Sequence, residues 1–277
     1  MTQTVSLSSI SIVLVKTSHP GNVGSVARAM KTMGLTDLRL VEPKDPLVCE
    51  HEEAQALSSG AQDVLRAARV FASLPDALVD VNLSYALSAR LRELGPVLQN
   101  PVQAAQEGLN RLGEGHGIAF VFGAERTGLS NEELLLCNRQ VYIPGNPNYN
   151  SLNLAQAVQI VSYALRQEWL NLTETGGDGA VPVHLPLKPG GKAVVRATGK
   201  AVHDLRDHWV KTMEAVDFIN PQKPKKLIER LTRMLARVEL EREEVDMLRG
   251  FLSDVNRVAQ GRLYPHEIGR QESQASD

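Results

Sequence analysis

The sequence contains little cysteine, since only Cys49 and Cys137 occur among its 277 residues. Two thiols without the paired spacing of a metal site argue against a disulfide framework and a zinc motif, and they favour a reducing compartment. The seven histidines are scattered and form no HxxxH pair. We therefore expect no metal in this protein.

Long apolar runs are also missing, and the N-terminus lacks a basic region followed by an apolar stretch. A membrane-spanning helix needs about 20 predominantly apolar residues, and a secretory signal needs both parts of that N-terminal pattern. We therefore expect a cytoplasmic protein with no membrane partner. The formal net charge of −2 is too small to attract nucleic acid as a whole, so any RNA contact would come from a local basic patch.

The common catalytic motifs are absent as well. The turn Gly21-Asn22-Val23-Gly24 fits neither the GxGxxG fingerprint of dinucleotide-binding proteins nor the GxxxxGK[ST] loop of nucleotide hydrolases. No nucleophile elbow is present either. Nicotinamide chemistry and nucleotide hydrolysis are therefore poorly supported.

What the sequence does contain is an alternation of strand and helix patterns. Ile10 to Val15 predicts a buried strand, Val23 to Met33 a helix, and Leu38 to Val41 the next strand, and the alternation continues to about residue 168. Such alternation predicts an α/β domain with a mostly parallel sheet, which binds ligands at the carboxyl ends of its strands. We predict this domain over 1–170, a linker over 171–199, a helical unit over 200–262 and a disordered tail over 263–277.

The predicted helical unit carries a row of cations on its middle helix. The row consists of Lys226, Arg230, Arg233 and Arg237, and it lies beside an apolar stripe of Leu227, Leu231, Met234 and Val238. Residues three and four apart share a face of a helix. The row is either a solvated helix face or a surface that contacts the RNA backbone.

Three polar loops follow predicted strands, and their residues are the candidate site. They span His19 to Gly24, Gly123 to Leu129, and Asn146 to Asn153. The third loop runs into a helix whose apolar residues Leu154, Val158 and Val161 recur at helical spacing. Asn and Ser favour helix caps, so this loop is either an ordinary cap or a ligand site at a helix N-terminus.

The three loops resemble the signature motifs of the SPOUT-class RNA 2′-O-ribose methyltransferases, in the order of that family. The matching segments are Asn22-Val23-Gly24-Ser25-Val26-Ala27-Arg28, Phe122-Gly123-Ala124-Glu125-Arg126-Thr127-Gly128-Leu129 and Tyr149-Asn150-Ser151-Leu152-Asn153-Leu154-Ala155. The resemblance covers about residues 10 to 168. It implies a C-terminal trefoil knot in the α/β domain, a homodimer with active sites at its interface, and S-adenosylmethionine as methyl donor.

Within that class, the sequence is most similar to bacterial tRNA methyltransferases that modify the ribose of C or U at position 32 of the anticodon loop. The resemblance implies the same activity here, with tRNA as partner. It implies catalytic roles for Arg28, Asn22, Glu125, Ser151 and Asn153. It implies donor contacts by Leu87, Ser88, Ala89, Gly123, Ile143, Asn150, Ser151 and Leu152.

Arg28 is the residue that the resemblance marks for chemistry on the ribose hydroxyl. Arginine is not deprotonated in proteins, so we expect Arg28 to orient a substrate phosphate and stabilise the developing alkoxide. Asn22 would fix Arg28 or the ribose, and Glu125 would hold its loop or anchor Arg28. Tyr149 would either stack on a base or pack against the following helix.

One segment departs from the family pattern, because Ala86 stands where relatives carry Gly and Leu87 where they carry Thr. The added side chain could crowd the donor, and a hydroxyl is lost. Two alternatives stay open beside the tRNA enzyme, and the second of them rests on this departure. They are a methyltransferase acting on ribosomal RNA, and a non-catalytic RNA-binding dimer that no longer binds the donor.

Overall fold

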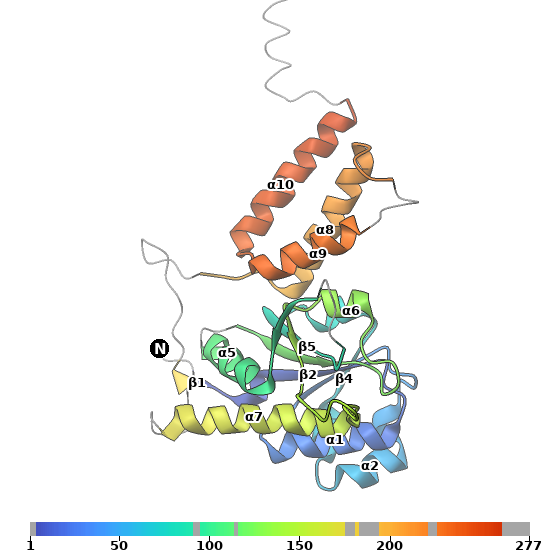
Figure 1. Ribbon diagram of the computed structural model, residues 1–277, viewed down its shortest axis with the longest axis vertical. Helices are drawn as coiled ribbons and strands as arrows, with labels where there is room; N and C mark the ends of the chain where they lie inside the picture. The colour runs from blue at the N-terminus through green and yellow to red at the C-terminus, as the bar shows by residue number, and fades with distance from the viewer. Residues whose placement is uncertain are drawn as a thin grey trace, which may run out of the picture.

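The computed structural model describes residues 4–90, 95–113, 116–174, 181–182, 194–220 and 226–261. An α/β domain and a helical unit stand one above the other, joined through the start of α8 (Gly199–Ala215) (Figure 1). Much of the predicted linker and the whole predicted tail, 263–277, lie outside the described residues. The domain boundaries stay a prediction.

Within the described ranges, the main sheet has seven strands, and every pairing in it is parallel. The strands are β2 (Ile10–Val15), β3 (Asp37–Val41), β4 (Arg69–Phe71), β5 (Leu83–Leu87), β6 (Val97–Gln99), β7 (Ile118–Phe122) and β8 (Arg139–Val141). Their spatial order is β4-β3-β2-β7-β5-β8-β6. A separate short pair joins β1 (Thr4–Val5) to β9 (Val181–Pro182). The predicted α/β class with a mostly parallel sheet is confirmed, while the knot stays a prediction.

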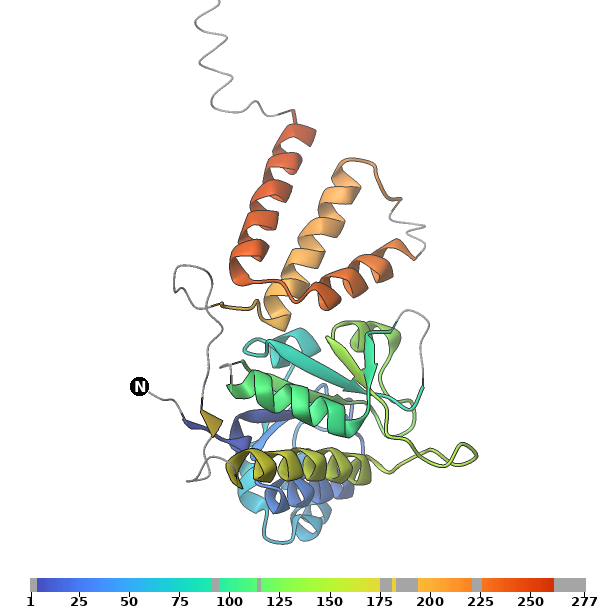
Figure 2. The same cartoon turned by 60° about the vertical axis from the view of Figure 1, so that its left-hand side comes forward.

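Helices cover both faces of the sheet, as the continuous apolar strands require. The helices of this domain are α1 (Pro20–Thr32), α2 (Glu52–Ser58), α3 (Gln62–Ala67), α4 (Leu74–Ala77), α5 (Pro101–Gly113), α6 (Asn131–Leu135) and α7 (Leu154–Glu174), with short 3-10 turns at Leu7–Ser9 and Val48–Glu50. The long α7 packs against α1 and α5 (Figure 2). It continues past residue 170 to Glu174.

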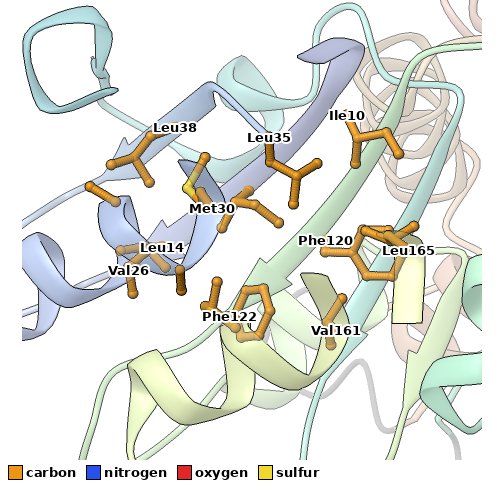
Figure 3. Close-up of a cluster of buried hydrophobic side chains, with 14 of the residues drawn as sticks. Ile10, Leu14, Val26, Met30, Leu35, Leu38, Phe120, Phe122, Val161 and Leu165 are labelled. Carbon is orange, nitrogen blue, oxygen red and sulfur yellow. The ribbon is translucent and has the colours of Figure 1, made fainter. Parts of the chain in front are cut away.

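The alternation of side chains along each strand divides the core into two layers. On one face Leu14, Phe120 and Phe122 pack with residues of α1 and α7 such as Met30 and Val161 (Figure 3). On the other face the neighbouring strand residues pack against α4 and α6; the set includes Val13, Val15, Val41, Ala86, Ala119, Val121, Leu74 and Leu134. The two layers hold the strand ends, and therefore the loops that follow them, in fixed positions.

The helical unit consists of α8, α9 (Leu227–Val238) and α10 (Arg242–Ala259) around its own small core. The apolar stripe predicted on α9 is partly wrong, because Met234 and Val238 are 38% and 54% exposed. The buried residues of α9 are instead Leu231, Thr232, Leu235 and Ala236. Leu227 and Leu231 of the stripe do pack in this core, and contacts with α6 as well as α8 add Leu235 and Ala236 to the buried face in place of Met234 and Val238. Among the described helices, none is long and apolar enough to cross a membrane.

Candidate active site

A cavity of about 310 Å³ lies at the carboxyl ends of β5, β7 and β8. This is the edge at which open parallel sheets bind ligands. All eight residues predicted to contact the donor line this one cavity: Leu87, Ser88, Ala89, Gly123, Ile143, Asn150, Ser151 and Leu152. The fold therefore brings these residues together from three separate segments, which follow β5, β7 and β8.

Several lining residues were not predicted, although they stand in or beside the quoted motifs. They include Arg90, Arg126, Thr127, Leu129, Val141 and Ala157. Their position in the sequence close to the motifs was the only signal that could have identified them as lining residues. Periodicity could not distinguish them from ordinary loop or helix residues.

The wall that follows β7 depends on glycine at two positions. A Cβ on Gly123 would lie 2.2 Å from the carbonyl carbon of Gly128, so the loop can close on itself only when no side chain is present. Gly128 itself has a φ of +67°, which L residues with side chains rarely adopt. Its amide donates to the Ala124 carbonyl at 2.8 Å and closes the turn. The closed turn holds the backbone of residues 123–129 against the cavity.

Ala86 does not crowd this cavity. Its methyl group is fully buried in the core layer on the opposite face of the sheet, whereas Leu87 faces the cavity side. The alternation of side chains along a strand puts neighbours on opposite faces. The expected crowding by Ala86 is therefore wrong, and only the change at Leu87 bears on the cavity.

The third loop caps α7, as its composition predicts. Asn153 Oδ1 accepts a hydrogen bond from the Ala155 amide at 2.9 Å, while Asn153 Nδ2 donates to Asn22 Oδ1 at 2.9 Å. One side chain thus caps the helix and ties the third loop to the first. Tyr149 is 80% exposed, so it does not pack against α7 within this chain.

Glu125 is the acceptor that holds the first loop in place. Its carboxylate accepts from the hydroxyl groups of Thr17 at 2.9 Å and Ser18 at 3.2 Å, from the amides of Ser18 and His19, and from Asn22 Nδ2 at 3.2 Å. Burial raises the pKa of this carboxyl, but these hydrogen bonds outweigh burial and leave the pKa below its ordinary value. Glu125 is therefore a charged anchor for residues 17–22.

Arg28 lies on an exposed face of α1 and lines a different cavity, of about 720 Å³. Asn22 and Asn153 line the same cavity, together with Ser25, Gln156 and Glu53. In the described part of the chain, the Arg28 guanidinium donates no hydrogen bond and forms no ion pair. Glu125 therefore holds the loop and does not anchor Arg28, which decides between the two expected roles.

The five residues predicted to be catalytic are thus divided between two cavities of one chain. Arg28, Asn22 and Asn153 line the larger cavity, whereas Glu125 and Ser151 line the cavity at the strand ends. Asn22 connects them, because it donates to Glu125 and accepts from Asn153. The described residues include no group of His, Cys, Asp and Glu side chains that could hold a metal ion.

Comparison with known proteins assigns this arrangement to a family. The model of the SpoU rRNA Methylase family matches residues 9–163, and that of the C-terminal domain of the tRNA methyltransferase TrmJ matches residues 200–263. The chain belongs to the SpoU methylase family. Both cavities lie within the residues that match the SpoU family. The three helices of the helical unit lie almost entirely within the residues that match the TrmJ C-terminal domain.

The likeness to TrmJ proteins extends over nearly the whole chain. It is 40% identical to a tRNA (cytidine/uridine-2′-O-)-methyltransferase TrmJ of Klebsiella pneumoniae, over 92% of this chain and 100% of that protein. It is 38% identical to a tRNA (cytidine/uridine/adenosine-2′-O-)-methyltransferase TrmJ of Pseudomonas aeruginosa, over 93% and 98%. The crystal structure of TrmJ from Z. mobilis has a TM-score of 0.72 and 29% identity, covering 88% of this chain and 98% of that one.

Within the TrmJ C-terminal match, the four predicted RNA-binding cations do not share one environment. Lys226, Arg230 and Arg237 are exposed, whereas Arg233 is half-buried. Arg233 and Arg237 line a small cavity with Asn138 and residues 95–97 of the SpoU domain. The row therefore runs from solvent to the contact between the two units.

Proposed function

We propose that this protein methylates the ribose 2′-hydroxyl of C or U at position 32 in the tRNA anticodon loop, with S-adenosylmethionine as methyl donor. The observation that carries the proposal is the single cavity lined by all eight expected donor residues. It is supported by the full-length similarity to tRNA 2′-O-methyltransferases. Methylation of tRNA also agrees with a cytoplasmic location.

The donor cavity fits its proposed ligand in size and chemistry. Its volume of about 310 Å³ falls at the lower end of the range of roughly 300–1,000 Å³ that is usual for small-molecule sites. Asn150, Ser151 and Leu152 offer amide, hydroxyl and backbone groups without a charge. When bound, the sulfonium donor would supply an electrophilic methyl carbon to the ribose oxygen, with its carbon–sulfur bond breaking to leave S-adenosylhomocysteine.

Arg28 acts on the acceptor side of this reaction. The ribose hydroxyl loses its proton as the new bond between oxygen and methyl carbon forms, and the guanidinium stabilises the developing alkoxide and orients a substrate phosphate. The phosphate or a water molecule takes the proton, because arginine keeps its own protons in proteins. Asn22, held between Glu125 and Asn153, fixes the start of α1, the helix that carries Arg28.

A homodimer explains why Arg28 and the donor cavity are separate within one chain. Leu152, Ile160 and Tyr163 are 40%, 37% and 54% exposed, on the third loop and on α7. A second copy seated on this face would cover apolar side chains and place its own donor cavity next to Arg28. The active site then combines groups of two chains.

Nucleoside mass spectrometry of tRNA incubated with the protein and S-adenosylmethionine tests the proposal. We expect a 2′-O-methylated nucleoside that maps to position 32. The description of the SpoU family as rRNA methylases supports one competing substrate. Ribosomal RNA is therefore reacted in parallel, and a methylated nucleoside in that RNA alone would overturn the tRNA assignment.

The second alternative, a dimer that binds RNA without catalysis, predicts that the donor does not bind. Calorimetry with S-adenosylhomocysteine measures this directly. We expect saturable binding at micromolar concentration, corresponding to about 8 kcal/mol. Absence of binding together with absence of methylated nucleoside would favour the non-catalytic alternative.

A further inference from the structure

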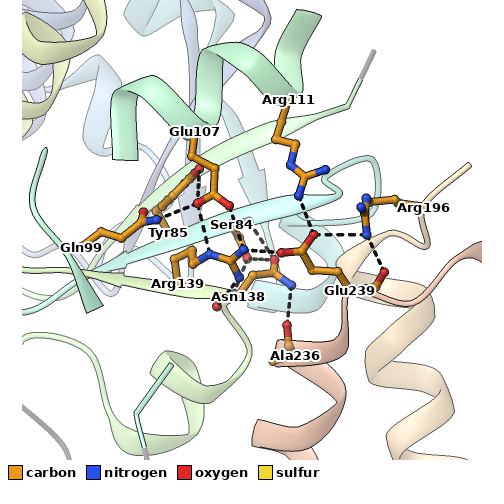
Figure 4. Close-up of polar contacts among 10 residues, drawn as sticks. All are labelled: Ser84, Tyr85, Gln99, Glu107, Arg111, Asn138, Arg139, Arg196, Ala236 and Glu239. Atoms are coloured by element: carbon orange, nitrogen blue, oxygen red, sulfur yellow. Dashed lines mark hydrogen bonds and ion pairs between the residues drawn. The ribbon is translucent and has the colours of Figure 1, made fainter. Parts of the chain in front are cut away.

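Glu239 connects the helical unit to the sheet through three arginines. It is the residue at which α9 ends. Its carboxylate accepts from Arg139 at the start of β8, from Arg111 of α5 at 3.0 Å, and forms an ion pair with Arg196 at 3.2 Å (Figure 4). Arg196 also donates to the backbone carbonyl of Glu239 at 2.8 Å. A single carboxylate thus joins α5, β8, the segment before α8, and the end of α9.

The connection is buried. The side chains of Glu239 and Arg139 are only 13% and 10% exposed. Burial lowers the pKa of Arg139, but its hydrogen bonds to Glu107 and Glu239 outweigh burial and leave the pKa raised. Without Glu239, Arg139 would keep only the carboxylate of Glu107, and Arg111 and Arg196 would both lose this ion pair. Uncompensated buried charge is strongly unfavourable.

The backbone conformation of Glu239 indicates that this position requires the glutamate side chain and not only a residue that can end α9. Its φ is +53°, a left-handed conformation in which a helix end favours glycine. A residue needed only to end α9 would be better as glycine. Asp217, which follows α8, has a similar φ of +55° but an exposed side chain, so it offers a matched comparison.

The connection lies between the two surfaces that the proposed reaction uses. Arg139 is the first residue of β8, and Val141 at the other end of that strand lines the donor cavity. On the other side, α9 carries Arg230 and Arg237, which are exposed in the turns before Glu239. Glu239 and β8 therefore form a direct connection between the cations and the cavity, beside the packing of α9 on α6 and the hydrogen bond from Asn138 Nδ2 to the Ala236 carbonyl.

We propose that Glu239 is a positioning residue for tRNA, which fixes the basic row of α9 relative to the donor cavity. The inference rests on the proposed function, because it takes tRNA as the substrate, and on the predicted contact between this row and the RNA backbone. Glu239 itself touches neither substrate nor donor. Its loss should therefore weaken productive tRNA binding and leave the chemistry of bound tRNA intact.

Steady-state kinetics of Glu239→Gln and Glu239→Gly test the proposal, with Asp217→Gly as the matched control. For both Glu239 variants we expect KM for tRNA to rise roughly tenfold, with kcat and the Kd for S-adenosylhomocysteine changed less than about twofold. The control should match the wild type in all three. Arg111→Gln, which removes a more exposed partner, should give a smaller rise in KM and keeps the test valid if the Glu239 variants do not fold.

Two results would overturn the proposal. Unchanged KM in Glu239→Gly and Arg111→Gln would show that Glu239 only ends the helix. A parallel loss of kcat, donor binding and thermal stability would show a general structural role. Failure of the proposed function itself is distinguishable, because the wild-type protein would then form no 2′-O-methylated nucleoside in tRNA.

Discussion

Arg28 is an exposed cation in a cavity with many polar side chains, and no carboxylate among the described residues forms an ion pair with it. A guanidinium in this state is available for a phosphate or an alkoxide. We expect Arg28→Ala to lower the rate of tRNA methylation by about 10²- to 10³-fold, the usual effect of removing one group that stabilises transition-state charge. Calorimetry should show unchanged donor binding, because Arg28 does not line the donor cavity.

Arg66→Ala is the control, since Arg66 is an exposed arginine on the nearby α3. It should keep wild-type activity. Full methylation by Arg28→Ala would remove Arg28 from the reaction.

Glu125 makes the first loop sensitive to acid. Its native pKa lies below the ordinary value of 4.5, so its charged form contributes stability above pH 4.5, and this contribution is lost as the pH falls through the native pKa. Glu125→Gln should therefore be less stable than wild type at neutral pH, with the difference shrinking below pH 4.5. Thermal unfolding followed across pH checks this. A difference that stays constant at all pH values would contradict it.

At the residue scale, the sequence indicated which residues line the site better than it indicated which hydrogen bonds they make. The second and third motifs contain Gly123, Asn150, Ser151 and Leu152, and the resemblance outside the motifs added Leu87, Ser88, Ala89 and Ile143; all eight line one cavity. The resemblance left open whether Glu125 bonds the loop or Arg28, since that choice depends on the path of residues 17–22. It also placed Ala86 against the donor, an error that came from ignoring which face of β5 the methyl group occupies.

At the scale of elements, the start of α7 combines two roles in one side chain. Asn153 caps the helix with its oxygen and bonds Asn22 with its nitrogen. Asn153→Ala should lower the free energy of unfolding by about 1 kcal/mol and also slow methylation. Asn153→Asp keeps a capping oxygen but cannot donate to Asn22, so its stability should stay near wild type while methylation slows.

Denaturant unfolding and methylation rates of these two variants separate the roles. Wild-type activity in Asn153→Asp would mean that the bond to Asn22 has no part in the reaction.

Elements with strong apolar periodicity or clear caps were predictable from the sequence. The strands β2 and β3 and the cap of α7 by the third loop are found as expected. The edge strand β6 is half-exposed and only three residues long, so it gives almost no pattern. The face of α9 was misassigned because its packing partners come from a distant segment.

For the whole molecule, the separation of the two cavities predicts complementation between inactive chains. Arg28→Ala spoils the acceptor side, and Gly123→Ala spoils the donor side, because its new Cβ would lie 2.2 Å from Gly128. In mixed dimers one site would combine the intact halves. Refolding the two variants together should restore about a quarter of wild-type methylation, as expected for random pairing in a two-fold dimer.

Each variant refolded alone is the control and should stay inactive. Failure of the mixture, with dimers shown by light scattering, would place Arg28 and its donor in one chain. The resemblance alone suggested a homodimer. The arrangement of the cavities gives a physical reason for one, which no composition or periodicity could have provided.

The bond between Asn22 and Asn153 has a consequence for synthesis. These residues are 131 positions apart, and the donor cavity also needs residues 150–157, so the site is completed late along the chain. Contacts of long sequence separation form slowly, because bringing the two ends of a long loop together costs conformational entropy. A ribosome-bound chain that ends before α7 should therefore have no affinity for the donor, and donor present during refolding should not speed the formation of the bond between Asn22 and Asn153.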